Sequence, residues 1–388
     1  MPVADRILTT HVGSLPRPLA LVELMLARQA GRPVDEAAYA AAVGKAVEDV
    51  VARQVALGID VVSDGEESKT SFVAYVNERL GGFEPETGQE ARRTSFDGSR
   101  EHLSFPEFYA RHAQGRAPGS RPPHLRCTGP ITYIGRALVE SDIANLKAAL
   151  AKTKGAAAFI PAVAPASIEN WQRNTYYKSD EEYLFAIADA MAVEYRAIVD
   201  AGFLLQVDDP SIVSHYTKMP DLDHAGMRKW AELRVAALNH ALKGIPEEKV
   251  RHHTCYGINM GPRVHDLELK HIVEVILRIR AGAYSFEAAN PRHEHEWRLW
   301  EEVKLPEGKA LIPGVISHTT VLVEHPELIA ERLMRYAKVV GRERVIAGGD
   351  CGFASHPSTE PEVHPSIVWA KFEAMVEGAR LASKQLWA

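Results

Sequence analysis

Short apolar segments that end in polar or acidic residues recur along this chain, and helix-like stretches separate most of them. One example is Phe203-Leu-Leu-Gln-Val-Asp-Asp-Pro210, in which an apolar run ends in two acids. Such runs are typical of parallel strands that helices cover on both faces. Nine segments of this kind occur, at residues 7–16, 59–65, 124–132, 157–165, 203–210, 250–256, 283–287, 310–317 and 345–351. The alternation predicts an α/β fold, and 388 residues fit a single (β/α)8 TIM barrel with insertions.

A closed barrel of this type holds eight strands, so one of the nine segments should be irregular. We expect it to be the first segment, 7–16, or Phe159–Val163.

Two helices carry clear end signals. Asp35 precedes a helix predicted over 36–57, which Gly58 ends, and Ser179-Asp-Glu-Glu182 is a capping box that opens a helix reaching residue 200.

We interpret residues 1–388 as one domain, because no linker interrupts the pattern. The least regular stretch, 84–123, mixes arginines with aromatic residues between the second and third strands. A solvated insertion is the simplest interpretation. Because about forty residues is long for a passive loop, we predict that this insertion is a lid over the active site.

Composition excludes several classes of function. A net charge of −6 and a pI near 6.3 give no reason to expect nucleic acid or an anionic membrane as a partner. No apolar run is long enough to span a bilayer, and the first residues do not resemble a signal peptide. Three cysteines cannot build a disulfide framework. We therefore expect a cytoplasmic protein that acts on small molecules, and the sequence leaves a homo-oligomer open.

The strand over 250–256 carries His253 and Cys255 two positions apart, so both side chains point to the same side. One imidazole and one thiolate are half of a tetrahedral zinc site. Two later strands end in Glu287 and Cys351, which completes a candidate zinc set. The alternative is that a lone cysteine is a small buried hydrophobe, as we interpret Cys127. The residues alone leave both interpretations open.

Acidic groups follow other strands. Glu66 and Glu67 come after Asp64-Gly65, where a solvated turn is the simpler interpretation. The run Pro291-Arg-His-Glu-His-Glu296 suggests a second metal site, but two nearby tryptophans on a probable helix favour a solvated face.

Three motifs together resemble the zinc-binding set of the cobalamin-independent methionine synthases: His253-x-Cys255, Ser285-Phe-Glu287 and Asp350-Cys351-Gly352, in the same chain order. The resemblance begins at Thr9-Thr-His-Val-Gly-Ser14 and covers the catalytic C-terminal half of those long enzymes. The chain looks like a short, single-domain type, related to the epoxyalkane:coenzyme M transferases. This resemblance implies a zinc TIM barrel whose metal ligands are His253, Cys255, Glu287 and Cys351.

The resemblance also implies roles for residues outside the metal set. Ser14 matches the loop that holds an amino-acid carboxylate, and Glu66 and Asp208 match the acids that bind the substrate amino group. Asp209 stands where the family has a glutamate. His318 matches the histidine that transfers a proton, so we predict that it is catalytic.

One segment departs from the family pattern. Thr128-Gly129-Pro130 resembles the turn that precedes the folate region, but residues 133–138 hold no tryptophan where the family stacks one on the pterin. We therefore expect weak folate binding, unless aromatic residues of the 84–123 insertion supply it.

The ligand set favours a particular chemistry. Two thiolates and a carboxylate leave Zn²⁺ with a net negative charge, which is poor for activating water and good for holding a nucleophilic thiolate. We expect zinc-dependent methyl transfer to homocysteine, giving methionine. The alternatives are a transferase that joins another thiol, such as coenzyme M, to an epoxide or other electrophile, and a zinc hydrolase or a structural zinc protein.

Overall fold

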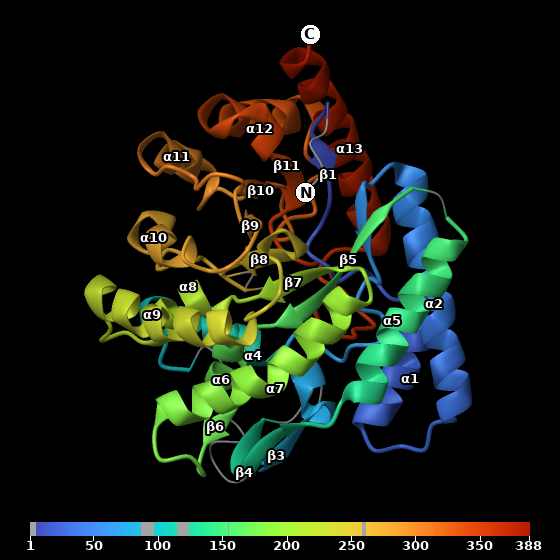
Figure 1. Cartoon of the computed structure of the whole chain (residues 1–388), viewed down its shortest axis with the longest axis vertical. Coiled ribbons are helices and arrows are strands. Elements are labelled where there is room, and N and C mark those ends of the chain that lie inside the picture. Colours follow the sequence, from blue (N-terminus) through green and yellow to red (C-terminus); the bar gives the residue numbers. More distant parts are fainter. Residues whose placement is uncertain (1–4, 87–96, 115–123, 154, 258–260) are drawn as a thin grey trace.

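The computed structural model describes residues 5–86, 97–114, 124–153, 155–257 and 261–388. Parallel strands form an eight-stranded sheet in the order β1-β11-β10-β9-β8-β7-β5-β2, and a parallel bridge between Thr10 and Val61 joins its two edges (Figure 1). The predicted (β/α)8 TIM barrel is therefore confirmed. Its strands are β1 (Leu8–Thr9), β2 (Val61–Ser63), β5 (Ala157–Val163), β7 (Leu204–Asp208), β8 (Val250–Thr254), β9 (Ala283–Phe286), β10 (Ala310–Ile316) and β11 (Ile346–Gly349).

The strands are buried almost throughout, as parallel strands covered on both faces should be. Helices surround the sheet, and the longer ones are α1 (Leu19–Gln29), α2 (Glu36–Leu57), α5 (Arg136–Ala151), α7 (Asp180–Asp200), α9 (His224–Ala241), α12 (Pro326–Val340) and α13 (Pro365–Leu386). The predicted helix ends are confirmed. Asp35 accepts hydrogen bonds from two amides of α2, Gly58 ends that helix at φ 87°, and Ser179 caps α7.

The ninth strand-like segment is not the one that we expected. Both 7–16 and Phe159–Val163 contribute barrel strands, whereas all but the first residue of 124–132 belong to β4 (Leu125–Tyr133), outside the barrel. There β4 pairs with β3 (Leu80–Pro85) and β6 (Arg173–Asn174) in a separate sheet. Only Cys127 of β4 is buried, because its polar residues alternate along a ribbon that is open on one side. A barrel strand would have needed a continuous apolar run.

The insertion between β2 and β5 contains two short helices, α3 (Arg100–Ser104) and α4 (Pro106–Gln114). The parts of the predicted lid at 87–96 and 115–123 lie outside the described residues. Arg100 donates to the carbonyls of Tyr216, Met219 and Leu222, at and just beyond α8 (Ser211–Lys218). This fastens α3 beside the chain that follows β7. Lid function itself stays a prediction.

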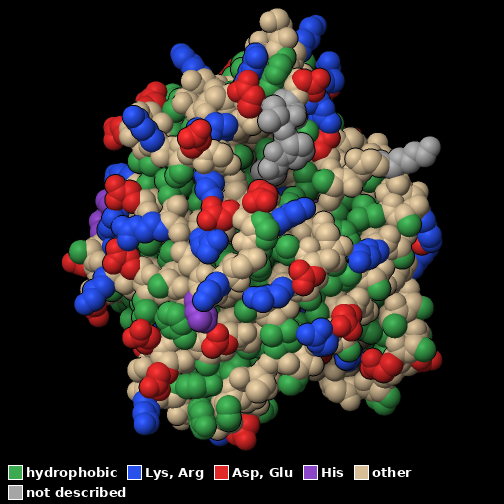
Figure 2. Space-filling model, viewed as in Figure 1, with side chains coloured by type: hydrophobic (Ala, Val, Ile, Leu, Met, Phe, Trp, Pro, Cys, Tyr) green, Lys and Arg blue, Asp and Glu red, His purple; other side chains and the backbone are tan. Residues whose placement is uncertain are grey.

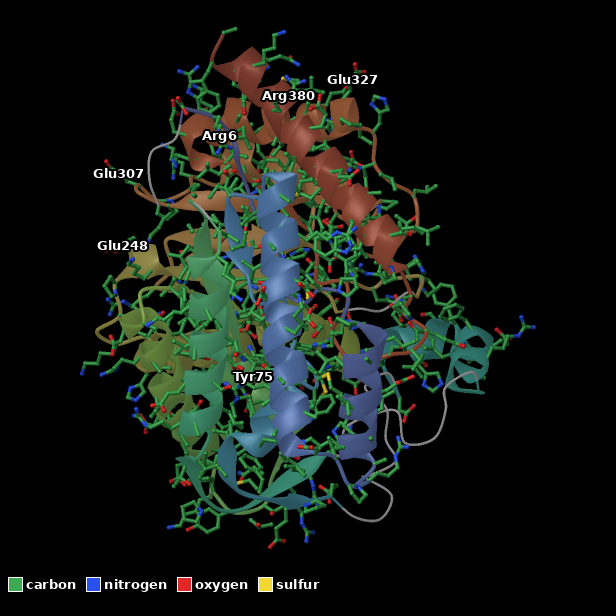
Figure 3. All side chains as sticks on the ribbon, turned by 90° about the vertical axis from the view of Figure 1, so that its right-hand side faces the viewer. Arg6, Tyr75, Glu248, Glu307, Glu327 and Arg380 are labelled. Carbon is green, nitrogen blue, oxygen red and sulfur yellow. The ribbon has the colours of Figure 1, made fainter. Side chains whose placement is uncertain are left out.

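Charged side chains of both signs are interspersed on the face shown in Figure 2. The charged residues labelled in Figure 3, such as Glu248 and Arg380, are exposed, whereas Tyr75 is buried against the barrel. Among the helices of the described residues, none combines the length and apolar character that a membrane span requires.

Glu67, just after β2, is fully buried, and neither of its carboxylate oxygens has a hydrogen-bond partner among the described residues. The solvated turn that we favoured from the sequence is therefore wrong for this residue. Burial raises the pKa of Glu67 to about 8.

We predict that Glu67→Gln stabilises the protein increasingly as the pH rises from about 5 to 8. The folded protein keeps Glu67 protonated up to about pH 8, whereas the unfolded chain ionises it above its ordinary pKa of 4.5. Each pH step between these values therefore favours unfolding of the wild type, and glutamine removes that effect. Thermal unfolding near pH 5, 6.5 and 8 measures the difference, with exposed Glu23→Gln as the control. A gap in Tm that did not change with pH would contradict this prediction.

Candidate metal centre and substrate pocket

All the predicted site residues lie at or just beyond the carboxyl ends of barrel strands, which is the face where this fold builds active sites. They come from seven of the eight strands. His253 and Cys255 belong to β8 and its exit, and the others are Ser14 after β1, Glu66 after β2, Asp208 at the end of β7, Glu287 after β9, His318 after β10 and Cys351 after β11.

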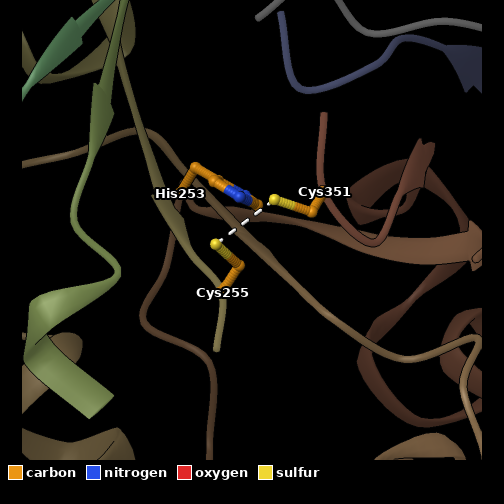
Figure 4. Close-up of side chains that lie close together, drawn as sticks. All are labelled: His253, Cys255 and Cys351. Carbon is orange, nitrogen blue, oxygen red and sulfur yellow. Dashed lines mark hydrogen bonds between the residues drawn. The ribbon is translucent and has the colours of Figure 1, made fainter. Parts of the chain in front are cut away.

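His253, Cys255 and Cys351 converge, and one ligand atom from each lies within 4.8 Å of the others (Figure 4). The Cys351 thiol donates to the Cys255 sulfur at 3.3 Å. All three side chains are buried. The alternation of β8 brings His253 and Cys255 to one side, and barrel closure supplies Cys351.

The donor atoms fit a soft divalent cation such as zinc. His253 Nδ1 lies 3.0 Å from the Ser285 hydroxyl, which fixes the ring, while Nε2 is buried without a hydrogen-bond partner in the described part of the chain. Burial lowers the pKa of His253 well below its usual value, so the imidazole is neutral, as a ligand must be. The hydrogen bond to Cys255 and burial raise the pKa of Cys351. A bound cation reverses that preference.

Glu287 does not join these three residues. Its Oε1 accepts from the Tyr256 amide, and its Oε2 accepts from Arg263 Nη2 and Asn290 Nδ2, each at 2.8 Å. A carboxylate oxygen of Glu287 lies within 4.8 Å of His318 and Asp350 instead. The structure thus brings together three of the four predicted ligands, and the role of Glu287 as a ligand stays a prediction.

A pocket beside the metal centre is lined by His253, Cys255 and Cys351 together with Ser14, Glu66 and Asp208. Glu66 adopts a left-handed backbone conformation, with φ 56°, that is unusual for a residue other than glycine. Its Oε2 has no partner among the described residues. Backbone strain and an unsatisfied buried oxygen at one position are typical of a binding site.

Burial raises the pKa of both Glu66 and Asp208, and the nearby Glu66 raises that of Asp208 further. Two acids that disfavour each other's charge are suited to a ligand ammonium, which stabilises both as carboxylates. Gln206 Nε2 donates to Asp208 Oδ1 at 2.7 Å and holds that carboxylate in place. Buried Lys69 donates to the Pro161 carbonyl and lowers the pKa of both acids. Sequence reasoning missed Gln206 and Lys69, since no motif marks either residue.

His318 lines a second hollow next to the pocket that contains Glu66 and Asp208. Gly352 and Ser355 line both cavities. Neither ring nitrogen has a hydrogen-bond partner of normal geometry in the described residues. Burial lowers the pKa of His318 to about 4, so the ring is neutral near pH 7. A Cβ at Gly352 would lie 2.0 Å from Ser14 Oγ, so a larger residue there would displace the Ser14 hydroxyl.

Four other residues have structural surroundings. Asp209 accepts from the Ser167 hydroxyl and is not among the residues that line the pocket, and Cys127 is part of the core, as expected. His293 and Glu296 correct our interpretation of residues 291–296 as a solvated face, because both are buried and hydrogen-bond each other. Burial opposes the charge on His293, but hydrogen bonds to Asp266 and Glu296 raise its pKa to about 9.

Comparison with known families bears on this geometry. The model of the catalytic domain of cobalamin-independent synthases matches residues 7–97 and 162–380. The chain belongs to this family. The predicted resemblance is confirmed, and the unmatched residues 98–161 contain α3, α4, β4 and α5.

Relatives in the cobalamin-independent synthase family match over nearly their whole length. Methionine synthase of Sulfurisphaera tokodaii is 25% identical over 381 residues, covering 97% of this chain and 93% of that protein. Methionine synthase of Thermococcus kodakarensis is 23% identical, covering 97% and 94%. The solved B12-independent methionine synthase of Shewanella sp. W3-18-1, in complex with selenomethionine, has a TM-score of 0.73 at 20% identity, covering 98% and 99% of the two chains. That likeness supports the fold.

We predict one zinc ion per chain, with zinc–sulfur contacts near ~2.3 Å and zinc–nitrogen contacts near ~2.1 Å. Cys351→Ala should reduce the zinc retained after dialysis, because it removes a thiolate ligand. Cys127→Ala is the matched control, since it also removes a buried thiol but leaves the centre intact. Elemental analysis of both variants makes the comparison, and equal zinc in the two would rule out Cys351 as a ligand.

Proposed function

We propose that this protein transfers a methyl group to the sulfur of homocysteine, which is held on zinc, and so forms methionine. The observation that carries the proposal is the position of the His253, Cys255 and Cys351 cluster on the wall of a pocket that also contains Glu66 and Asp208. A metal-binding donor set and a recognition site for an ammonium group therefore share one cavity. An amino acid that ends in a thiol fits both.

The proposed zinc ligands are His253, Cys255 and Cys351, with Glu287 as the fourth. Zinc, when bound, would act as a Lewis acid that keeps a substrate thiol deprotonated and nucleophilic near pH 7. The chain's own groups position the substrate. Glu66 and Asp208 would hold its ammonium group, and Ser14 would bind its carboxylate.

The same pocket argues against a thiol such as coenzyme M as the acceptor. Coenzyme M carries a sulfonate and no amino group, so Glu66 and Asp208 would have no cation to bind. The absence of tryptophan at 133–138 bears only on the identity of the donor. It favours a methyl or alkyl donor that is not a pterin. In addition, the Tyr133 hydroxyl donates to Glu194 at 2.6 Å, which ties this ring of the side sheet to α7.

His318 is the proposed general acid. It faces the hollow next to the thiol pocket, where the leaving group of an in-line transfer would lie. Negative charge that develops on the leaving atom would favour the protonated imidazole, which burial by itself disfavours. The ring can then donate its proton to that atom.

Asp208→Asn should weaken homocysteine binding about tenfold or more, because hydrogen bonds to charged groups contribute about 1.5–3 kcal/mol. Binding of 4-mercaptobutyrate, which lacks the amino group, should change little. Asp209→Asn is the matched control, since the neighbouring acid contacts Ser167. Calorimetric titration of the zinc-loaded proteins measures all these affinities. Equal losses for the two thiols would mean that Asp208 does not recognise the amino group.

Replacing His318 with Asn should leave zinc content and thiol affinity unchanged, in contrast to Cys351→Ala, which should lower both. Turnover should slow by about 10² to 10⁴ with a donor whose leaving atom is nitrogen or oxygen, because general acid catalysis is worth that much. A sulfonium donor, whose leaving sulfur needs no proton, should be largely spared. Single-turnover rates with both donor types test this. Loss of zinc, or equal slowing with both donors, would show that His318 has another role.

A further inference from the structure

A chain of buried charges runs outward from Glu287. Arg263 bridges Glu287 and Asp266 with 2.8 Å contacts, and His293 bridges Asp266 and Glu296 at 3.1 and 2.9 Å. All five side chains are at most 7% exposed, so water screens these interactions little. Among these five residues, Arg263 is the cation that lies next to the metal centre.

The backbone at Arg263 is strained. Its φ of 59° is left-handed, which is uncommon for a residue other than glycine. Glu101 of α3 compensates for this, because its Oε2 accepts from the Arg263 amide at 3.1 Å and its Oε1 accepts from the His265 amide at 3.0 Å. Glu101 is itself fully buried. The insertion therefore holds the segment that presents Arg263 to Glu287.

The net charge of the centre explains why such a cation is needed. Two thiolates and the Glu287 carboxylate exceed the charge of one divalent ion by one, and an incoming substrate thiolate would add another negative charge. Arg263 cancels one of these charges at close range. Its Nη1 is also buried without a partner among the described residues, so a donor remains available.

We propose that Arg263, positioned by Glu101 of the insertion, is the counter-charge that allows the metal centre to accept an anionic sulfur ligand. The proposal rests on the proposed function and adds to it a role for the insertion. Glu101 lies in 98–161, which the family model does not match.

The test compares zinc affinity and thiol affinity in Arg263→Gln. Loss of the positive charge should weaken the binding of an anionic thiolate but not the binding of a cation. Removing a nearby cation should leave zinc affinity unchanged or tighter in a chelator competition. It should weaken homocysteine binding about tenfold to a hundredfold, as expected for unit charges roughly 6–12 Å apart at an effective dielectric constant of about 20. Methionine, whose thioether is neutral, should bind as it does to the wild type. Arg263→Lys, which keeps the charge, should recover part of the homocysteine affinity.

Arg234→Gln is the matched control, because Arg234 is also a buried arginine paired with a glutamate, Glu169, away from the centre. It should leave all three affinities unchanged. Glu101→Gln loses one carboxylate acceptor and should weaken homocysteine binding in the same direction, with no further loss when combined with Arg263→Gln.

Two results would overturn the proposal while leaving the proposed function intact: wild-type homocysteine affinity in Arg263→Gln, or parallel loss of zinc, homocysteine and methionine binding. The first means that Arg263 does not balance the charge, and the second that it is only structural. A wild-type protein that binds zinc but no homocysteine would overturn the proposed function, and this proposal with it.

Discussion

Closure of the parallel sheet is the constraint on which the rest of the structure depends. The bridge between Thr10 and Val61 gives every barrel strand two neighbours, so the carboxyl ends of all the strands form one ring. Cys255 and Cys351 are far apart in the chain, yet their sulfurs lie 3.3 Å from each other on that ring. The position of each ligand is therefore fixed by the register of its strand and by barrel closure together.

The ring divides into polar groups that have partners and groups that do not. Asp350 accepts from the Ala288 and Ala289 amides and from Asn290, and Glu287 is equally well supplied with donors. In contrast, Glu66 Oε2 and His253 Nε2 are buried without partners in the described chain. Leaving such groups unsatisfied costs stability. A bound metal ion and a bound substrate would supply the missing partners. The groups with partners, such as Asp350 and Glu287, therefore support the site, and those without, such as Glu66 and His253, bind.

The insertion between β2 and β5 is fastened to the loops that follow the barrel strands. Residues 98–161 fall outside the family match, but α3 within them is fastened to the segment after β8 through Glu101 and to α8 through Arg100. The Ser104 hydroxyl adds a 2.7 Å contact with His265 Nε2. These contacts join the insertion to the loops that surround the metal centre.

The sequence by itself determined the alternation of strands and helices, the capped ends of α2 and α7, and the pairing of His253 with Cys255 on one side of β8. These features depend on local periodicity and local hydrogen bonds, which a sequence displays directly. The order of the motifs also carried the family resemblance, which the family model confirms.

Tertiary structure decided the rest. It placed β4 in a side sheet, because a strand with polar residues on one face cannot be buried on both faces in the barrel wall. It paired Glu287 with Arg263 rather than with the cysteines, and it buried Glu67 and His293 where the sequence favoured solvated turns and faces. A carboxylate or an imidazole looks the same in a sequence whether it is solvated or paired. Only contacts between distant segments determine its partners, its burial and therefore its charge.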